Sequence, residues 1–219
     1  MKEPRAAGTT HSDTPASRVV FPGIVFQDII DVSAEEIRRR VVEAMDRVFE
    51  LDDDRLLVLV GALLVENSLD RLLGAFMPGY RQLRDKREFS FSVRIELARA
   101  LRLCPDCLFN CTDVVRSIRN DFVHELSTDS FARLKRERVQ SMRDHVSNFS
   151  PDDVLGETDA MVFKILVTYL VAQLELYRLH IEWLNEFIRS EEFGPLFTSF
   201  CERRGLVQSG GHNAIQSPD

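Results

Sequence analysis

The sequence has little of what a membrane or secreted protein needs. Its most apolar region, 161–184, is interrupted by Lys164, Gln173, Glu175 and Arg178, whereas a membrane-spanning helix needs about twenty mostly apolar residues. The N-terminal segment is polar and lacks the apolar middle region of a signal peptide. We therefore predict a cytoplasmic protein without a membrane-spanning segment.

Cysteine is also scarce, with four in 219 residues. In a protein without a secretory signal, so few cysteines indicate reduced thiols rather than a disulfide framework. Cys104, Cys107 and Cys111 lie in the segment CPDCLFNC, and thiolates at this spacing can share a zinc ion or an iron–sulfur cluster. However, no second paired motif supplies a fourth ligand. We favour small buried thiols over a metal site and predict no cofactor.

The chain carries a formal net charge of −7, so as a whole it repels nucleic acid. Any polyanion site must be a local patch. Residues 81–102 hold seven basic side chains against three acidic ones. Runs of one sign are common on exposed helices. We favour an ordinary solvated surface there over a phosphate-binding one.

The pattern of apolar residues predicts a single all-α domain over residues 19–206. Residues 1–18 and 207–219 are rich in small and polar residues, which predicts disordered tails. Between the tails, the longest run with strand character, RVVFPGIVF, is interrupted by Pro22 and Gly23. We expect helices over about 33–50, 52–76, 92–103, 114–126, 130–146, 159–192 and 195–203.

Three local patterns add detail to this prediction. Ser33, with Glu36 three residues later, is typical of a capping box that begins a helix. The segment 56–65 is apolar on all sides, which predicts a helix in the middle of a bundle. The segment 79–89 is polar and predicts a loop.

The helix at 114–126, VVRSIRNDFVHEL, carries polar residues that a core does not need. Its buried stripe is Val114, Val115, Ile118, Phe122 and Leu126. Asn120 and His124 lie on the far side, and Arg119 lies at the border of the apolar stripe. At about 100° per residue, Arg119 and His124 are about 140° apart. One regular helix cannot aim both at a small ligand, but a local bulge or a second copy across a dimer axis could bring them together.

If these side chains converge, the chemistry they suit is phosphodiester cleavage. A histidine can act as general acid or base, and a guanidinium can stabilise the charge that builds on the phosphoryl oxygens. In RNA the 2′-hydroxyl is the internal nucleophile, so no metal is required, and Asn120 could orient the phosphate or the imidazole. In the structural alternative, Arg119 pairs with Glu66, Asn120 is solvated and His124 interacts with the helix C-terminus. We favour an ion pair for Glu66 over a supporting role in catalysis.

Three blocks, RLLVLVGALLVENSLDRLL, FSFSVRIELARAL and SIRNDFVHEL, resemble the mannitol operon repressor family in order and spacing, over residues 55–146. The family's Ile-Arg-Asn-x-Phe-x-His segment is matched by Ile118, Arg119, Asn120, Phe122 and His124. This resemblance implies a bacterial regulator of transcription. The chain lacks a helix-turn-helix with a basic recognition helix. We therefore expect regulation through a protein partner rather than direct DNA binding.

An arginine followed by a polar residue, with a histidine after four intervening positions, also resembles the motif of the HEPN superfamily. That resemblance implies a HEPN-like helical bundle that forms a homodimer. Many HEPN proteins are metal-independent ribonucleases of toxin–antitoxin or phage-defence systems. It therefore implies Arg119 and His124 as catalytic residues with Asn120 in support, RNA as substrate and an antitoxin as protein partner. A regulatory protein and an endoribonuclease are thus the two functions that the sequence leaves open.

Overall fold

The computed structural model describes residues 26–125, 127–150 and 156–203. Within these ranges the chain is helical and contains no β-strand, so the predicted all-α class is confirmed. The tails predicted at 1–18 and 207–219 lie outside the described residues.

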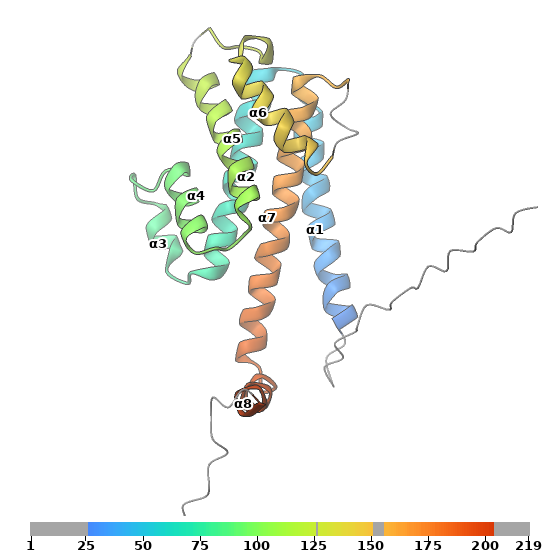
Figure 1. The fold of residues 1–219 in the computed structure, drawn as a ribbon, viewed down its shortest axis with the longest axis vertical. Helices are drawn as coiled ribbons and strands as arrows, with labels where there is room; N and C mark the ends of the chain where they lie inside the picture. The colour runs from blue at the N-terminus through green and yellow to red at the C-terminus, as the bar shows by residue number, and fades with distance from the viewer. Residues whose placement is uncertain (1–25, 126, 151–155, 204–219) are drawn as a thin grey trace, which may run out of the picture.

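The helices form a bundle around two long central helices, α2 and α7 (Figure 1). α1 flanks α7 on one side, and α5 and α6 pack around the upper part of α2 and α7 in this view. α3 and α4 lie against the lower part of α2, and α7 extends past them to α8. The elements are α1 (Phe26–Phe49), α2 (Asp54–Phe76), α3 (Tyr80–Arg84), α4 (Phe91–Ala100), α5 (Asp106–His124), the 3₁₀ turn η1 (Phe131–Arg133), α6 (Arg136–Ser147), α7 (Asp159–Arg189) and α8 (Phe193–Arg203).

Side-chain caps explain where several helices begin. The Asp53 carboxylate accepts a hydrogen bond from the Leu56 amide at 2.6 Å at the start of α2. The Thr158 hydroxyl accepts one from the Met161 amide at 3.2 Å at the start of α7. These bonds satisfy amide groups that have no partner inside the helix.

Two predictions about local structure are wrong. The capping box at Ser33 does not begin a helix, because α1 already starts at Phe26 and Ser33 lies inside it. The segment predicted as a polar loop contains the short helix α3, whose Tyr80 is buried against the core. Both corrections reflect tertiary packing, which overrides a weak local pattern.

The core is tightest where α2 crosses α7. Gly61 of α2 is buried, and an ideal Cβ at this position would lie 2.9 Å from Cε1 of Phe163 on α7. From there, aromatic rings continue to η1 and α5: Phe163 contacts Phe131 with ring centroids 5.5 Å apart, and Phe131 contacts Phe122 at 5.6 Å. These contacts lock α5 onto the central pair.

α2 lies in the middle of the bundle, as predicted for 56–65, but it is not buried on all sides. Leu56, Leu59 and Leu63 expose 47%, 38% and 57% of their surface. They recur at the spacing of one helix face, and no described helix covers them. α2 therefore presents an apolar stripe to solvent.

Among the described residues, α7 is the one helix long and apolar enough to cross a membrane by length and composition. Half of its most apolar stretch is buried inside the bundle. Its Lys164 side chain donates a hydrogen bond to the carbonyl of Phe49 at 3.0 Å. α7 therefore packs as a core helix of the bundle.

Candidate functional site

Arg119, Asn120 and His124 lie in the last two turns of α5. His124 is the final residue of the helix and is exposed, whereas Arg119 and Asn120 are half-buried. None of their three side chains makes a hydrogen bond or an ion pair with another described residue. These side chains are therefore not committed to holding the described fold together.

One chain does not bring Arg119 and His124 together. α5 is continuously α-helical from Asp106 to His124, so it contains no local bulge that could rotate one side chain toward the other. The separation of about 140° expected for a regular helix is retained. Convergence requires a second copy of the chain.

The predicted ion pair between Glu66 and Arg119 is wrong. Glu66 instead pairs with Arg94 of α4, and the Nε atom of Arg94 lies 3.3 Å from the Asp70 carboxylate. The Tyr80 hydroxyl donates a hydrogen bond to the same Asp70. Burial and the Asp70 carboxylate raise the pKa of Tyr80 above its ordinary value. Glu66 thus belongs to a network that fastens α3 and α4 to α2.

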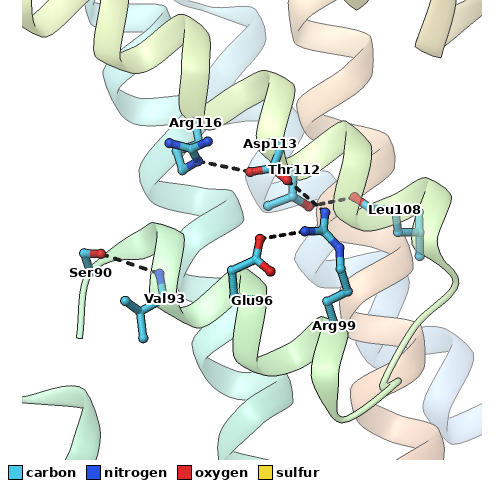
Figure 2. Close-up of polar contacts among 8 residues, drawn as sticks. All are labelled: Ser90, Val93, Glu96, Arg99, Leu108, Thr112, Asp113 and Arg116. Atoms are coloured by element: carbon cyan, nitrogen blue, oxygen red, sulfur yellow. Dashed lines mark hydrogen bonds and ion pairs between the residues drawn. The ribbon is translucent and has the colours of Figure 1, made fainter. Parts of the chain in front are cut away.

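A second network fastens α4 to α5 (Figure 2). The Asp113 carboxylate accepts hydrogen bonds from Arg99 at 2.8 Å and from Arg116 at 3.1 Å. The Arg99 guanidinium also lies 5.7 Å from the ring centroid of Phe109, and its hydrogen bond to Asp113 raises its pKa. Arg99 and Arg116 therefore have structural partners, in contrast to Arg119.

The two networks show where α4 contacts its neighbours. On α2 the contact with α4 reaches Glu66, and on α5 it reaches Asp113. Beyond these points the two helices run on antiparallel, joined where Arg55 donates a hydrogen bond to the carbonyl of Phe122 at 2.8 Å. The surface past α4, between the N-terminal half of α2 and the C-terminal half of α5, is left open.

Helical spacing identifies the residues on this open surface. Leu63, Leu59 and Leu56 continue the line of Glu66 along α2 at steps of three and four residues. Arg119 and Val123 continue the line of Arg116 along α5 in the same way, and Val123 is exposed. We call the set of Leu56, Leu59, Leu63, Arg119 and Val123 the α2–α5 face. Of these residues, only Arg119 is predicted from the sequence motif. The exposure of the leucines was not predicted, although their spacing at steps of three and four residues is visible in the sequence.

The three clustered cysteines differ in exposure. Cys104 and Cys111 are buried, as predicted for small core thiols, whereas Cys107 is exposed. Burial, with a smaller effect of Cys107, raises the pKa of Cys104 to about 12 and that of Cys111 to about 11. Both thiols are therefore protonated at neutral pH. In the described part of the chain, no group of three or more His, Cys, Asp or Glu side chains is placed to hold a metal ion.

No family model, curated protein or solved structure matches this chain. The resemblance to the mannitol operon repressor family therefore stays a prediction from sequence motifs.

Proposed function

We propose that this protein is a bacterial cytoplasmic regulatory protein that forms a homodimer and acts through protein contacts, as its resemblance to the mannitol operon repressor family implies. The observation that supports this function best is the α2–α5 face. It exposes three leucines of a central helix side by side, and contiguous apolar surface of this kind marks protein interaction sites. The net charge of −7 argues against a protein that binds DNA directly.

The leucine stripe of the face can pair with the same stripe of a second copy of the chain, which we propose as its occupant. The exposed residues Asp52 and Asp53 lie at one end of the leucine stripe. Arg116 lies toward the other end, about 9 Å along α5 from Phe122. A two-fold axis that pairs two stripes antiparallel sets Asp52 and Asp53 of each copy toward the end of the other stripe where Arg116 pairs with Asp113.

Replacing Leu59 and Leu63 together with glutamate tests this dimer. Four carboxylates would enter one symmetric interface, and we expect association to weaken at least about 100-fold because the charges are desolvated without partners. Sedimentation velocity should show a dimer for the wild-type protein and a monomer for L59E/L63E. The L59E/L63E monomer should remain folded and show a cooperative thermal transition, because both leucines are exposed in the single chain.

The matched control replaces Leu184 and Ile188, two exposed apolar residues of α7 far from the face, with glutamate. This variant should remain dimeric. A monomeric wild-type protein, or a dimer that persists in L59E/L63E, would overturn the proposed interface.

A second candidate function, metal-independent endoribonuclease, is supported by one specific observation. Arg119 is a half-buried member of the α2–α5 face and has no ion-pair partner among the described residues, so it does not make the ion pair that the structural alternative expects. Because Arg119 and His124 are about 140° apart on one α5, His124 would have to reach Arg119 of a second copy at the end of the paired helices. Two composite sites would then lie across the dimer axis.

RNA cleavage at such a site would use the side chains of His124, Arg119 and Asn120 and would need no metal ion. His124 would take the proton from a ribose 2′-hydroxyl, whose oxygen attacks the adjacent phosphorus. The P–O5′ bond breaks, the 5′-oxygen takes a proton from water, and the products are a 2′,3′-cyclic phosphate and a 5′-hydroxyl. Arg119 would stabilise the charge on the phosphoryl oxygens, and Asn120 would orient the phosphate or the imidazole.

Cleavage of single-stranded RNA in the presence of EDTA tests this function. If it is correct, His124→Ala and Arg119→Ala should each slow cleavage at least about 100-fold, while His180→Ala, which removes an exposed histidine of α7, should not. An inactive wild-type protein would reject the ribonuclease and leave the regulatory homodimer untouched. A monomeric variant that still cleaves would reject the composite site.

A further inference from the structure

α7 extends past the rest of the bundle and meets α8 at its end (Figure 1). Along this extension, Leu184 and Ile188 each expose 47% of their surface, and Phe197 of α8 exposes 54%. Leu184 and Ile188 are about 40° apart on the helix, so they lie on one face of it. A single exposed leucine needs no explanation, but contiguous exposed apolar surface marks an interaction site.

Four aromatic rings continue this apolar surface from α7 to α8. Trp183 stacks on Phe187 with ring centroids 5.6 Å apart, and Phe187 contacts Phe193 edge to face at 5.8 Å. Phe193 in turn stacks on Phe197 at 5.4 Å. Because the rings hold one another in place, they lose little side-chain entropy when a partner covers them. We call the following set the α7–α8 surface: Trp183, Leu184, Phe187, Ile188, Phe193 and Phe197.

The charges beside the α7–α8 surface are mostly acidic. Glu186 lies one helical turn after Trp183, and Glu191 and Glu192 lie in the turn between α7 and α8. These three glutamates are exposed and make no ion pair with another described residue. Arg189 is the one basic residue of the sequence 183–202. The surface therefore combines apolar and aromatic groups with a surplus of negative charge.

This combination selects among the possible occupants. The glutamates repel the phosphates of a nucleic acid and the anionic lipids of a membrane surface. A second copy of the chain would bring the same glutamates to the contact, and like charges across an interface oppose association. A protein segment that carries both apolar and basic side chains matches the surface in both respects.

We propose that the α7–α8 surface binds a basic amphipathic helix of a partner protein. Trp183 with Phe187, and Leu184 with Ile188, form two ridges of residues four apart, between which the apolar side chains of a helix can pack. Lysines or arginines at the border of that helix pair with the glutamates. This inference rests on the proposed function in that protein contacts carry the activity, but it does not depend on the homodimer.

The fluorescence of Trp183 tests the proposal, because Trp183 is the only tryptophan of the chain and belongs to the surface itself. The probe is a synthetic helical peptide without tryptophan, which has leucines on one face and lysines on the other. Titration into the full chain should shift the Trp183 emission to the blue in a saturable way, because the peptide removes water from the indole. A second peptide with glutamates in place of the lysines should bind at least about tenfold more weakly.

Variants separate the apolar contribution from the charges. L184S/I188S should weaken binding of the lysine peptide at least about tenfold, because it removes apolar contact without adding charge. E191K/E192K should weaken binding of the lysine peptide and strengthen that of the glutamate peptide. The matched control Glu137→Lys, which reverses an exposed charge of α6, should change neither.

Two results would overturn the proposal. One is the absence of a saturable shift with the lysine peptide, which is also the result expected if the apolar segment 19–25 of the same chain occupies the surface. The other is equal binding of the lysine and glutamate peptides, which would mean that the surface takes up apolar groups without regard to charge.

The same titration separates this inference from the proposed homodimer. Asn185 donates a hydrogen bond to the Ala75 carbonyl at 3.0 Å, and Leu63 lies about 18 Å from Ala75 along α2. The L59E/L63E variant should therefore give the same Trp183 shift as the wild-type protein. A wild-type monomer that binds the lysine peptide would overturn the homodimer alone, and a dimer that does not bind it would overturn the α7–α8 surface alone.

Discussion

Gly61→Leu will lower the free energy of unfolding by about 3 kcal/mol, because the side chain has no room at the crossing of α2 and α7. An ideal Cβ at Gly61 lies 2.9 Å from Cε1 of Phe163 and 3.0 Å from Cγ2 of Val167. Both neighbours are fully buried, so neither can move into solvent. Leucine has a better helix propensity than glycine by about 1 kcal/mol, which offsets only part of the loss. Urea unfolding followed by circular dichroism measures the change.

Gly74 of the same helix provides the matched control. A Cβ there would meet its nearest neighbour, Cδ1 of Tyr80, at 3.8 Å, which is ordinary contact. Gly74→Ala should therefore raise the free energy of unfolding by up to about 1 kcal/mol through helix propensity. Equal unfolding midpoints for Gly61→Leu and the wild-type protein would mean that α2 and α7 do not pack closely at Gly61.

Most of the helices could be predicted from local signals, because apolar spacing and caps act within a few residues. The acids before α2 and the apolar stretch of α7 are examples. The start of α1 could not be predicted, because Ser33 and Glu36 are also compatible with the interior of a helix. Packing decides how far that helix extends. α3 was missed because it has five residues and no side-chain cap. It is held by Tyr80, whose partner Asp70 lies ten residues away.

For the candidate site, the directions of side chains on a single helix could be predicted from the sequence. The contacts between side chains of different helices could not. The divergence of Arg119 and His124 follows from the pitch of α5 and is retained in the structure. The partner of Glu66 could not be predicted, because Arg94 lies 28 residues away and reaches Glu66 only after α4 docks. The exposure of Leu59 likewise depends on where α4 ends. The sequence of α2 alone does not indicate where α4 ends.

Glu175→Ala will lower the free energy of unfolding by about 3 kcal/mol, because it leaves a buried guanidinium with one partner fewer. Burial acts to lower the pKa of Arg178, but hydrogen bonds and charges from Glu175 and Glu182 outweigh it and hold the pKa above its ordinary value. The two carboxylates thus keep Arg178 charged inside the bundle. Thermal and urea unfolding of the variant measure the loss.

Two further variants show whether the cost comes from the uncompensated charge or from lost packing. Glu182 is the exposed partner of the same arginine, and Glu182→Ala should cost only about 1 kcal/mol because water replaces that carboxylate. The double variant Glu175→Leu/Arg178→Leu removes the buried pair together and should recover most of the stability lost in Glu175→Ala. If the double variant is the less stable of the two, the cost lies in the packing of α7 rather than in the unpaired charge. In that case Arg178 does not need Glu175 to remain inside the bundle.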